Sequence, residues 1–135
     1  MGQRLTVEVP KLDELLYQHL RESGVRVEKN FSPFESLSFN CDLALPDFQL
    51  LIEIEKGKQP RLEFDILKMF SAAAQHPNQW HYGLLIIPST FITLASAGRQ
   101  TSAQYLARLA NLTKPLSRCA TIRGIVVLPY KDPRQ

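Results

Sequence analysis

The sequence lacks several features that would assign it to a common class of protein. Its 135 residues include only two cysteines, Cys41 and Cys119, and both stand in largely apolar surroundings. Two distant cysteines are more typical of small buried side chains than of a disulfide framework or a zinc site, so we expect a reducing, cytoplasmic location. The opening MGQRLTVEVP alternates polar and apolar residues, and no apolar run reaches the roughly 18 residues of a membrane span. We therefore predict neither a signal peptide nor a contact with a membrane.

Common catalytic motifs are missing as well. The chain contains no Walker loop, no G-x-G-x-x-G turn and no serine or cysteine nucleophile motif. Sixteen Lys and Arg against thirteen Asp and Glu give a formal charge of +3, which permits a polyanionic partner without requiring one. The length predicts one domain over residues 1–135, with a short flexible tail over residues 131–135.

Apolar periodicity predicts alternating helices and strands. Helices are predicted over residues 11–23, 61–75 and 101–115, and strands over residues 25–31, 36–45, 48–55, 80–89 and 121–130. The last two strands are apolar on both faces, which is typical of strands covered on both sides. The order α-β-β-β-α-β-α-β predicts an α/β fold with a central mixed sheet flanked by helices.

The helix predicted over residues 61–75 has an apolar stripe and a polar one. Ile66, Phe70, Ala73 and Ala74 form the stripe that we expect to be buried. The charged residues of this helix, Arg61, Asp65 and Lys68, fall on the opposite, more polar side.

The stretch NCDLALPDFQLLIEIEKGKQ, residues 40–59, predicts a hairpin that carries carboxylates. A two-residue turn at Asp47 and Phe48 pairs Cys41 with Ile54, Leu43 with Ile52 and Leu45 with Leu50, which makes one face apolar. The opposite face then sets Asp42 across from Glu53, with Glu55 two residues further along. A turn at Pro46 and Asp47 would shift the register by two, and Glu53 would remain a diagonal neighbour of Asp42.

Three carboxylates on one face of a hairpin repel one another and destabilise it. The arrangement makes sense if a cation neutralises them, and hard oxygen ligands favour Mg²⁺, Mn²⁺ or Ca²⁺ over zinc. The alternative is that Asp42, Glu53 and Glu55 are ordinary polar side chains on a solvent-exposed face.

Asp42, a gap of ten residues and then Glu53-Ile54-Glu55, followed by a helix, resembles the PD-(D/E)XK nuclease superfamily. Glu55 stands where the commonest form of that motif has Lys, which is similar to the E-x-E variant of the BamHI type of restriction enzyme. Lys56 is adjacent, but strand alternation points it away from the carboxylate face. The resemblance implies a restriction endonuclease-like fold.

The resemblance also implies metal-dependent hydrolysis of DNA phosphodiester bonds. Asp42 and Glu53, with the backbone carbonyl of Ile54, would hold Mg²⁺ or Mn²⁺, and Glu55 would orient or deprotonate the attacking water. Because the usual Lys is absent, either the E-x-E site works without it, or Lys68 on the next helix supplies the cation, or the site is inactive. Cutting both strands would need a homodimer or a partner subunit.

Flanking cations would offset the repulsion between a carboxylate centre and DNA. Lys56, Lys58 and Arg61, at the mouth of the hairpin, are the predicted nucleic-acid contacts. Glu14 on the first helix is a further acidic candidate, although a solvated face explains it better. Two other functions remain open: an inactive nuclease-fold domain that binds nucleic acid or protein, and an unrelated α/β interaction protein.

Overall fold

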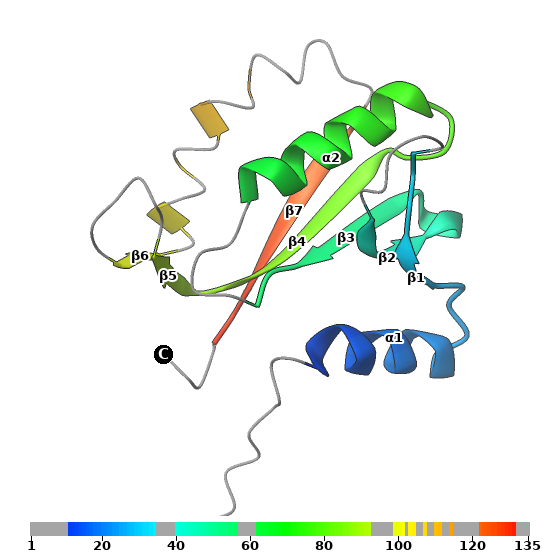
Figure 1. The fold of residues 1–135 in the computed structure, drawn as a ribbon, viewed down its shortest axis with the longest axis horizontal. Helices are drawn as coiled ribbons and strands as arrows, with labels where there is room; N and C mark the ends of the chain where they lie inside the picture. Colours follow the sequence, from blue (N-terminus) through cyan, green and yellow to red (C-terminus); the bar gives the residue numbers. More distant parts are fainter. Residues whose placement is uncertain are drawn as a thin grey trace, which may run out of the picture.

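The computed structural model describes residues 11–34, 40–56, 62–92, 99–101 and 122–131, with single residues between 103 and 114. These residues form an α/β fold with a five-stranded mixed sheet and a separate two-stranded one (Figure 1). The elements are, in chain order, α1 (Leu12–Glu22), β1 (Glu28–Phe31), β2 (Cys41–Leu45), the 3-10 turn η2 (Pro46–Phe48), β3 (Leu50–Ile54), α2 (Leu62–Gln75), β4 (Tyr82–Pro88), β5 (Thr90–Ile92), β6 (Arg99–Thr101) and β7 (Gly124–Tyr130).

The large sheet has the strand order β1-β2-β3-β4-β7. Its first three strands are antiparallel neighbours, whereas β3, β4 and β7 run parallel. The predicted mixed sheet is therefore confirmed. The helix predicted over residues 101–115 lies mostly outside the described residues. Thr101 ends strand β6 instead, and the other described residues of this range are helical and exposed, namely Ala103, Gln104, Ala107, Ala110, Asn111 and Lys114. Of the predicted tail, residues 132–135 lie outside the described part of the chain.

The predicted hairpin forms with the predicted register. Leu43 pairs with Ile52, and Leu45 pairs with Leu50. The expected two-residue turn is wrong, because residues 46–49 all lie outside the ladder. Pro46 has no N–H to donate to a ladder and begins the turn η2, and Gln49 ends it with a left-handed φ of 55°.

The first helix covers one face of the sheet. Its predicted end is confirmed: Gly24, with φ of 81°, donates its N–H to the carbonyl of Arg21 at 3.0 Å and turns the chain towards β1. The apolar side of α1 packs on a cluster formed by side chains of β2, β3 and β4, namely Leu43, Leu45, Ile52, Ile54 and Ile86. Figure 1 shows α1 and α2 on opposite sides of the sheet.

The second helix covers the other face. Of the predicted stripe, Ile66 and Ala73 are buried and Phe70 packs against the core, whereas Ala74 is exposed. Its apolar contacts come from Leu62, Ile66 and Met69, which pack on side chains of β4. The helix also buries Asp65 and Lys68, which were predicted on its polar side. The prediction was wrong for these two residues, because it placed every charged residue on the solvent side. Neither helix in the described part of the chain combines the length and apolarity needed to cross a membrane.

Strand β7 is an edge strand, contrary to the expectation that both of its faces are covered. Val126 and Leu128 are 63% and 53% exposed. They lie on the α1 side of the sheet, where the buried cluster under α1 is formed by side chains of β2, β3 and β4. The hairpin of β5 and β6 was not predicted from the sequence.

Close packing of α2 on β4 gives a first prediction. A Cβ added at Gly83 would lie closer to Sδ of Met69 than Cβ atoms approach in proteins, and Met69 is fully buried. We expect Gly83→Ala to lower the free energy of unfolding by about 1–3 kcal/mol, measured by urea denaturation. Gly124→Ala is the matched control, since a Cβ there meets nothing within 4 Å. Equal stability of the two variants would contradict the packing of α2 described here.

Candidate active site

Five ionisable side chains gather where β2 begins and β3 ends. The hairpin contributes Asp42 from β2, Glu53 from β3 and Glu55 just after β3. The first two turns of α2 contribute Asp65 and Lys68, which were predicted on its solvent side. In open α/β sheets, ligands bind beyond the carboxyl ends of the parallel strands, which is where these side chains lie relative to β3.

A buried ion pair joins Glu53 to Lys68. Nζ of Lys68 lies 2.7 Å from Oε1 of Glu53 and donates a hydrogen bond of 3.1 Å to the carbonyl of Asn40. The two residues are only 4% and 9% exposed. Lys68 therefore connects α2 to β3 and to the residue that precedes β2.

The pKa values of this pair reflect its burial. Burial raises the pKa of Glu53 to about 7; Lys68 acts against that rise, and the nearby charge of Asp42 adds to it. For Lys68, burial lowers the pKa, but the contacts with Glu53 and Asp65 outweigh it and raise the pKa overall. The lysine thus stays charged, whereas the glutamate titrates near neutrality.

The carboxylate of Asp42 binds the backbone of the facing strand. Its Oδ2 accepts a hydrogen bond of 2.7 Å from the N–H of Ile54. This bond holds Asp42 beside the residue that follows Glu53, as the predicted register requires. Asp42, Glu53 and the backbone of Ile54, the three proposed metal ligands, are therefore neighbours.

Asp65 is a site residue that the sequence did not reveal. It is 3% exposed, and its Oδ1 lies 3.8 Å from Nζ of Lys68. Burial, and then a hydrogen bond that the protonated acid donates to Glu55, raise the pKa of Asp65 to about 10. Its position three residues before Lys68, on the same side of α2, is the one signal that could have found it.

Cys41 lies against this centre as well. It is fully buried in a cluster with Phe34, Leu51, Ala72 and Trp80, on the α2 side. We had expected it on the face of Leu43, so that assignment is wrong. Burial first, and then the charge of Glu53, raise the pKa of the Cys41 thiol, which keeps it neutral. The other cysteine, Cys119, is outside the described residues.

The donor atoms of the centre suit a hard cation, although no metal cage is formed. Within the ranges that the structure describes, no three His, Cys, Asp or Glu side chains are grouped so as to hold a metal ion. Each carboxyl group instead contacts a group of the protein. Oε1 of Glu53 has the ammonium of Lys68 at 2.7 Å, whereas Oδ2 of Asp65 is buried and has no hydrogen-bond partner among the described residues. The centre also has four carboxyl groups and one ammonium, and two of the carboxyl groups, those of Glu53 and Asp65, lie within 4 Å of that ammonium.

The side chains of Lys56, one of the predicted DNA contacts, and of Glu14 form ion pairs away from the carboxylate centre. Nζ of Lys56 forms a 3.0 Å ion pair with Asp13 of α1, so it points away from the carboxylates, as alternation predicts. Lys58 and Arg61 lie outside the described residues. Glu14 pairs with Lys29 near the exposed surface of α1, which agrees with the expectation that Glu14 lies on a solvated face. Contact of these cations with nucleic acid remains a prediction.

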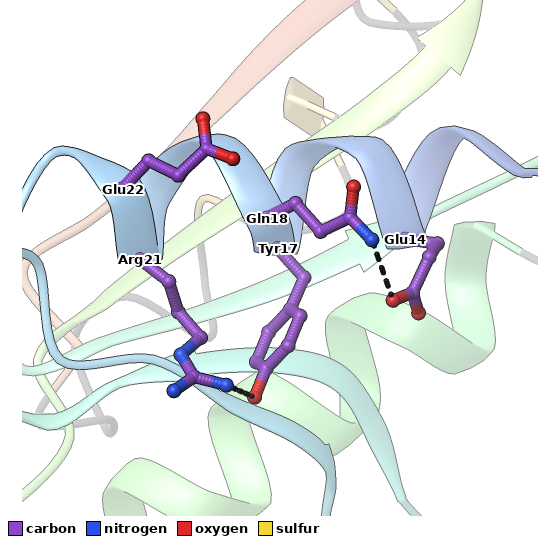
Figure 2. A pocket seen from close by; sticks show the side chains of 5 residues that line it. All are labelled: Glu14, Tyr17, Gln18, Arg21 and Glu22. Atoms are coloured by element: carbon purple, nitrogen blue, oxygen red, sulfur yellow. Dashed lines mark hydrogen bonds between the residues drawn. The ribbon is translucent and has the colours of Figure 1, made fainter.

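A hollow on α1 is separate from this centre. Figure 2 shows its lining side chains: Glu14, Tyr17, Gln18, Arg21 and Glu22. Gln18 donates a 3.4 Å hydrogen bond to Glu14, and Arg21 donates one of 3.2 Å to the hydroxyl of Tyr17. Since all five side chains come from one helix and several of them pair with one another, the hollow lacks the convergent polar groups of a ligand site.

Comparison of the chain with protein-family models, with curated proteins and with solved structures found no match.

The buried ion pair predicts strong coupling in a double-mutant cycle. Lys68→Met leaves Glu53 buried without its ammonium, and we expect the free energy of unfolding at pH 8.5 to fall by about 3 kcal/mol. The double variant with Glu53→Gln should regain most of this loss, as urea denaturation would show. At pH 5.5 the coupling should shrink, because a carboxyl with a pKa of about 7 is then neutral.

Lys56→Met is the matched control for this cycle. Its ion pair with Asp13 is about one-third exposed, and we expect the substitution to change stability by less than about 1 kcal/mol. Additive effects of Lys68→Met and Glu53→Gln would contradict the buried pair.

The pKa of Asp65 predicts how stability depends on pH. Because this pKa rises from 3.8 to about 10 on folding, the folded state binds the proton more tightly, and stability falls as the pH rises through that window. In EDTA, Asp65→Asn should therefore be more stable than wild type at pH 8, by at least about 1 kcal/mol, with a flatter profile from pH 5 to pH 9.

Glu63→Gln, an exposed substitution on the same helix, is the control and should leave the profile unchanged. If denaturation gave Asp65→Asn the same pH profile as wild type, Asp65 would not hold its proton in the folded state.

Proposed function

We propose that this chain is a metal-dependent nuclease that hydrolyses DNA phosphodiester bonds. The observation that carries the proposal is the contact between Lys68 and Glu53 at the end of the hairpin. It brings an ammonium group beside the carboxylates, although position 55 is Glu where the commonest form of the motif has Lys. Lys68 can therefore supply the cation that the motif lacks.

The arrangement of the elements supports a restriction endonuclease-like fold. A helix, an antiparallel three-stranded run, a second helix and a parallel strand follow one another, and the carboxylates lie on the second and third strands. This order and placement are those expected for the PD-(D/E)XK superfamily. The fold alone does not establish an activity, so the proposal depends on the site.

In this proposal Asp42, Glu53 and the carbonyl of Ile54 hold Mg²⁺ or Mn²⁺. The fit rests on an all-oxygen donor set, with one carboxylate from each strand of the hairpin and one backbone carbonyl. Three protein side chains are not required, since Mg²⁺ is commonly held by one or two carboxylates together with waters and substrate phosphates. When bound, the ion would polarise the scissile phosphate and lower the pKa of a bound water.

The protein's own groups have separate roles. Lys68 holds the carboxylate of Glu53 in place, and its ammonium stabilises the negative charge that grows on the phosphate in the transition state. Glu55, which is only half-buried, orients the attacking water and accepts its proton. Asp42, whose carboxylate accepts a hydrogen bond from the N–H of Ile54, keeps the carboxylate oxygens of the two hairpin strands close together.

DNA is the proposed substrate because the chain carries a net charge of +3 and has Lys56, Lys58 and Arg61 next to the carboxylates in sequence. One such centre cuts one strand, so cleavage of both strands requires a homodimer or a partner subunit.

One observation favours a second candidate, an inactive nuclease-fold domain that binds nucleic acid or a protein partner. Glu53 already has Lys68 as a counterion, and Asp42 already binds a backbone amide. Such contacts stabilise the hairpin carboxylates without a metal. In that case the centre is structural.

Cleavage assays separate the two candidates. Wild type, Glu53→Gln, Lys68→Met and Lys68→Arg are incubated with supercoiled plasmid, linear duplex and branched DNA in Mg²⁺, Mn²⁺ or EDTA. We expect wild type to cleave at least one substrate, EDTA to abolish cleavage, and Glu53→Gln and Lys68→Met each to reduce the rate by at least about 100-fold.

Glu63→Gln on the exposed side of α2 serves as the control and should cleave as wild type does. Circular dichroism confirms that each variant is folded. If folded wild type cuts none of the substrates in either metal, or if Glu53→Gln cuts as fast as wild type, the catalytic proposal fails and the binding domain takes its place.

A further inference from the structure

The carbonyl of Glu55 lies where the hydrogen-bond ladder between β3 and β4 breaks. Ile54 pairs with Ile86, and the N–H of Glu55 donates to the carbonyl of Ile86 at 2.8 Å. In a parallel ladder, a residue bonded in this way accepts its next hydrogen bond from the N–H two residues further along the partner strand. That residue is Pro88, which has no N–H. The carbonyl of Glu55 therefore has no ladder donor on β4.

The hydroxyl of Tyr130 takes the place of the missing N–H. It donates a hydrogen bond of 2.7 Å to the carbonyl of Glu55 from the end of β7, which lies on the other side of β4. Tyr130 is itself held in place, because its carbonyl accepts a 2.7 Å hydrogen bond from the N–H of Ser89 and its ring packs against the apolar cluster on the α1 side of the sheet. The donor for Glu55 thus comes from a well-packed side chain on a different strand.

The two hydrogen bonds of Glu55 hold the peptide groups on both sides of its Cα atom. Each peptide group is planar, so fixing both of them fixes φ and ψ of Glu55. The backbone dihedrals in turn restrict the rotamers that a side chain adopts. Glu55 comes directly after the last residue of β3, where the ladder no longer holds the chain. The bond from Tyr130 therefore limits the directions in which the carboxylate of Glu55 points.

We propose that Tyr130 is a positioning residue, which orients Glu55 towards the attacking water by holding the carbonyl of Glu55. This inference rests on the proposed function for the role of Glu55 as the group that accepts a proton from that water. Tyr130 acts only through Glu55 and contacts neither the water nor the phosphate. It adds a residue of β7 to a site that is otherwise formed by the hairpin and α2.

The first test is the rate of DNA cleavage by Tyr130→Phe, which keeps the packed ring and removes only the hydroxyl. We expect the turnover rate at saturating DNA to fall by at least about 10-fold, because a misoriented base slows the chemical step. The KM for DNA should stay within about twofold of wild type, since binding is unaffected. Tyr82→Phe, which alters an exposed tyrosine on β4, is the matched control and should cleave as wild type does.

A double-mutant cycle shows whether Tyr130 acts through Glu55. In the Glu55→Gln background, Tyr130→Phe should cause no further loss of turnover, because the group that it orients no longer accepts a proton. A general structural role would instead multiply the two losses. Pro88→Ala supplies an N–H where the ladder lacks one, so its combination with Tyr130→Phe should regain most of the lost turnover. Multiplied losses, or turnover by Tyr130→Phe at the wild-type rate, overturn the positioning role.

Hydrogen exchange at the N–H of Glu55, followed by NMR on the full chain, tests the restraint without cleavage. We expect this N–H to exchange at least about 10-fold faster in Tyr130→Phe than in wild type, and Tyr82→Phe to leave it unchanged. Faster exchange in a chain that cuts no DNA supports the restraint on Glu55 and overturns the nuclease. Cleavage that Glu53→Gln abolishes and Tyr130→Phe leaves unchanged overturns the positioning role, and the nuclease stands.

Discussion

The buried contact between Lys68 and Glu53 is the interaction on which the arrangement of this protein's candidate site depends. It links the second turn of α2 to β3, and the bond from Lys68 to the carbonyl of Asn40 extends the link to the start of β2. A charge at this depth is stable only when it is paired. The pairing therefore holds Lys68 at the hairpin, and Asp65, three residues earlier on the same side of α2, lies 3.8 Å from its ammonium.

Stability alone does not explain such a centre. The centre has four carboxyl groups and one ammonium, and burial raises the pKa of Glu53 to about 7 and that of Asp65 to about 10, which favours bound protons there. Replacing a buried ion pair by well-packed apolar residues of similar size is often neutral or stabilising. Groups with strongly perturbed pKa values cluster at functional sites, which is why we interpret this centre as a catalytic one.

Much of the fold could be predicted from the sequence, because hydrophobic periodicity reports burial. The alternation in residues 41–54 gave the correct hairpin register and so the placement of Asp42 and Glu53. Periodicity gave most of the buried stripe of α2, but it missed Asp65 and Lys68, since a pattern that treats charge as exposed cannot anticipate that these two side chains face another charge. It also failed for β7, because an apolar strand at a sheet edge has the same sequence signature as a covered one.

The most direct test of the account is the anomalous scattering of crystals of the full chain soaked in Mn²⁺. We predict an anomalous peak in contact with the carboxylate of Glu53, on the side of the hairpin that faces α2. Retention of the contact between Lys68 and Glu53 at saturating Mn²⁺, with no anomalous peak at any of the four carboxyl groups, would contradict the account and leave the ion pair a purely structural feature.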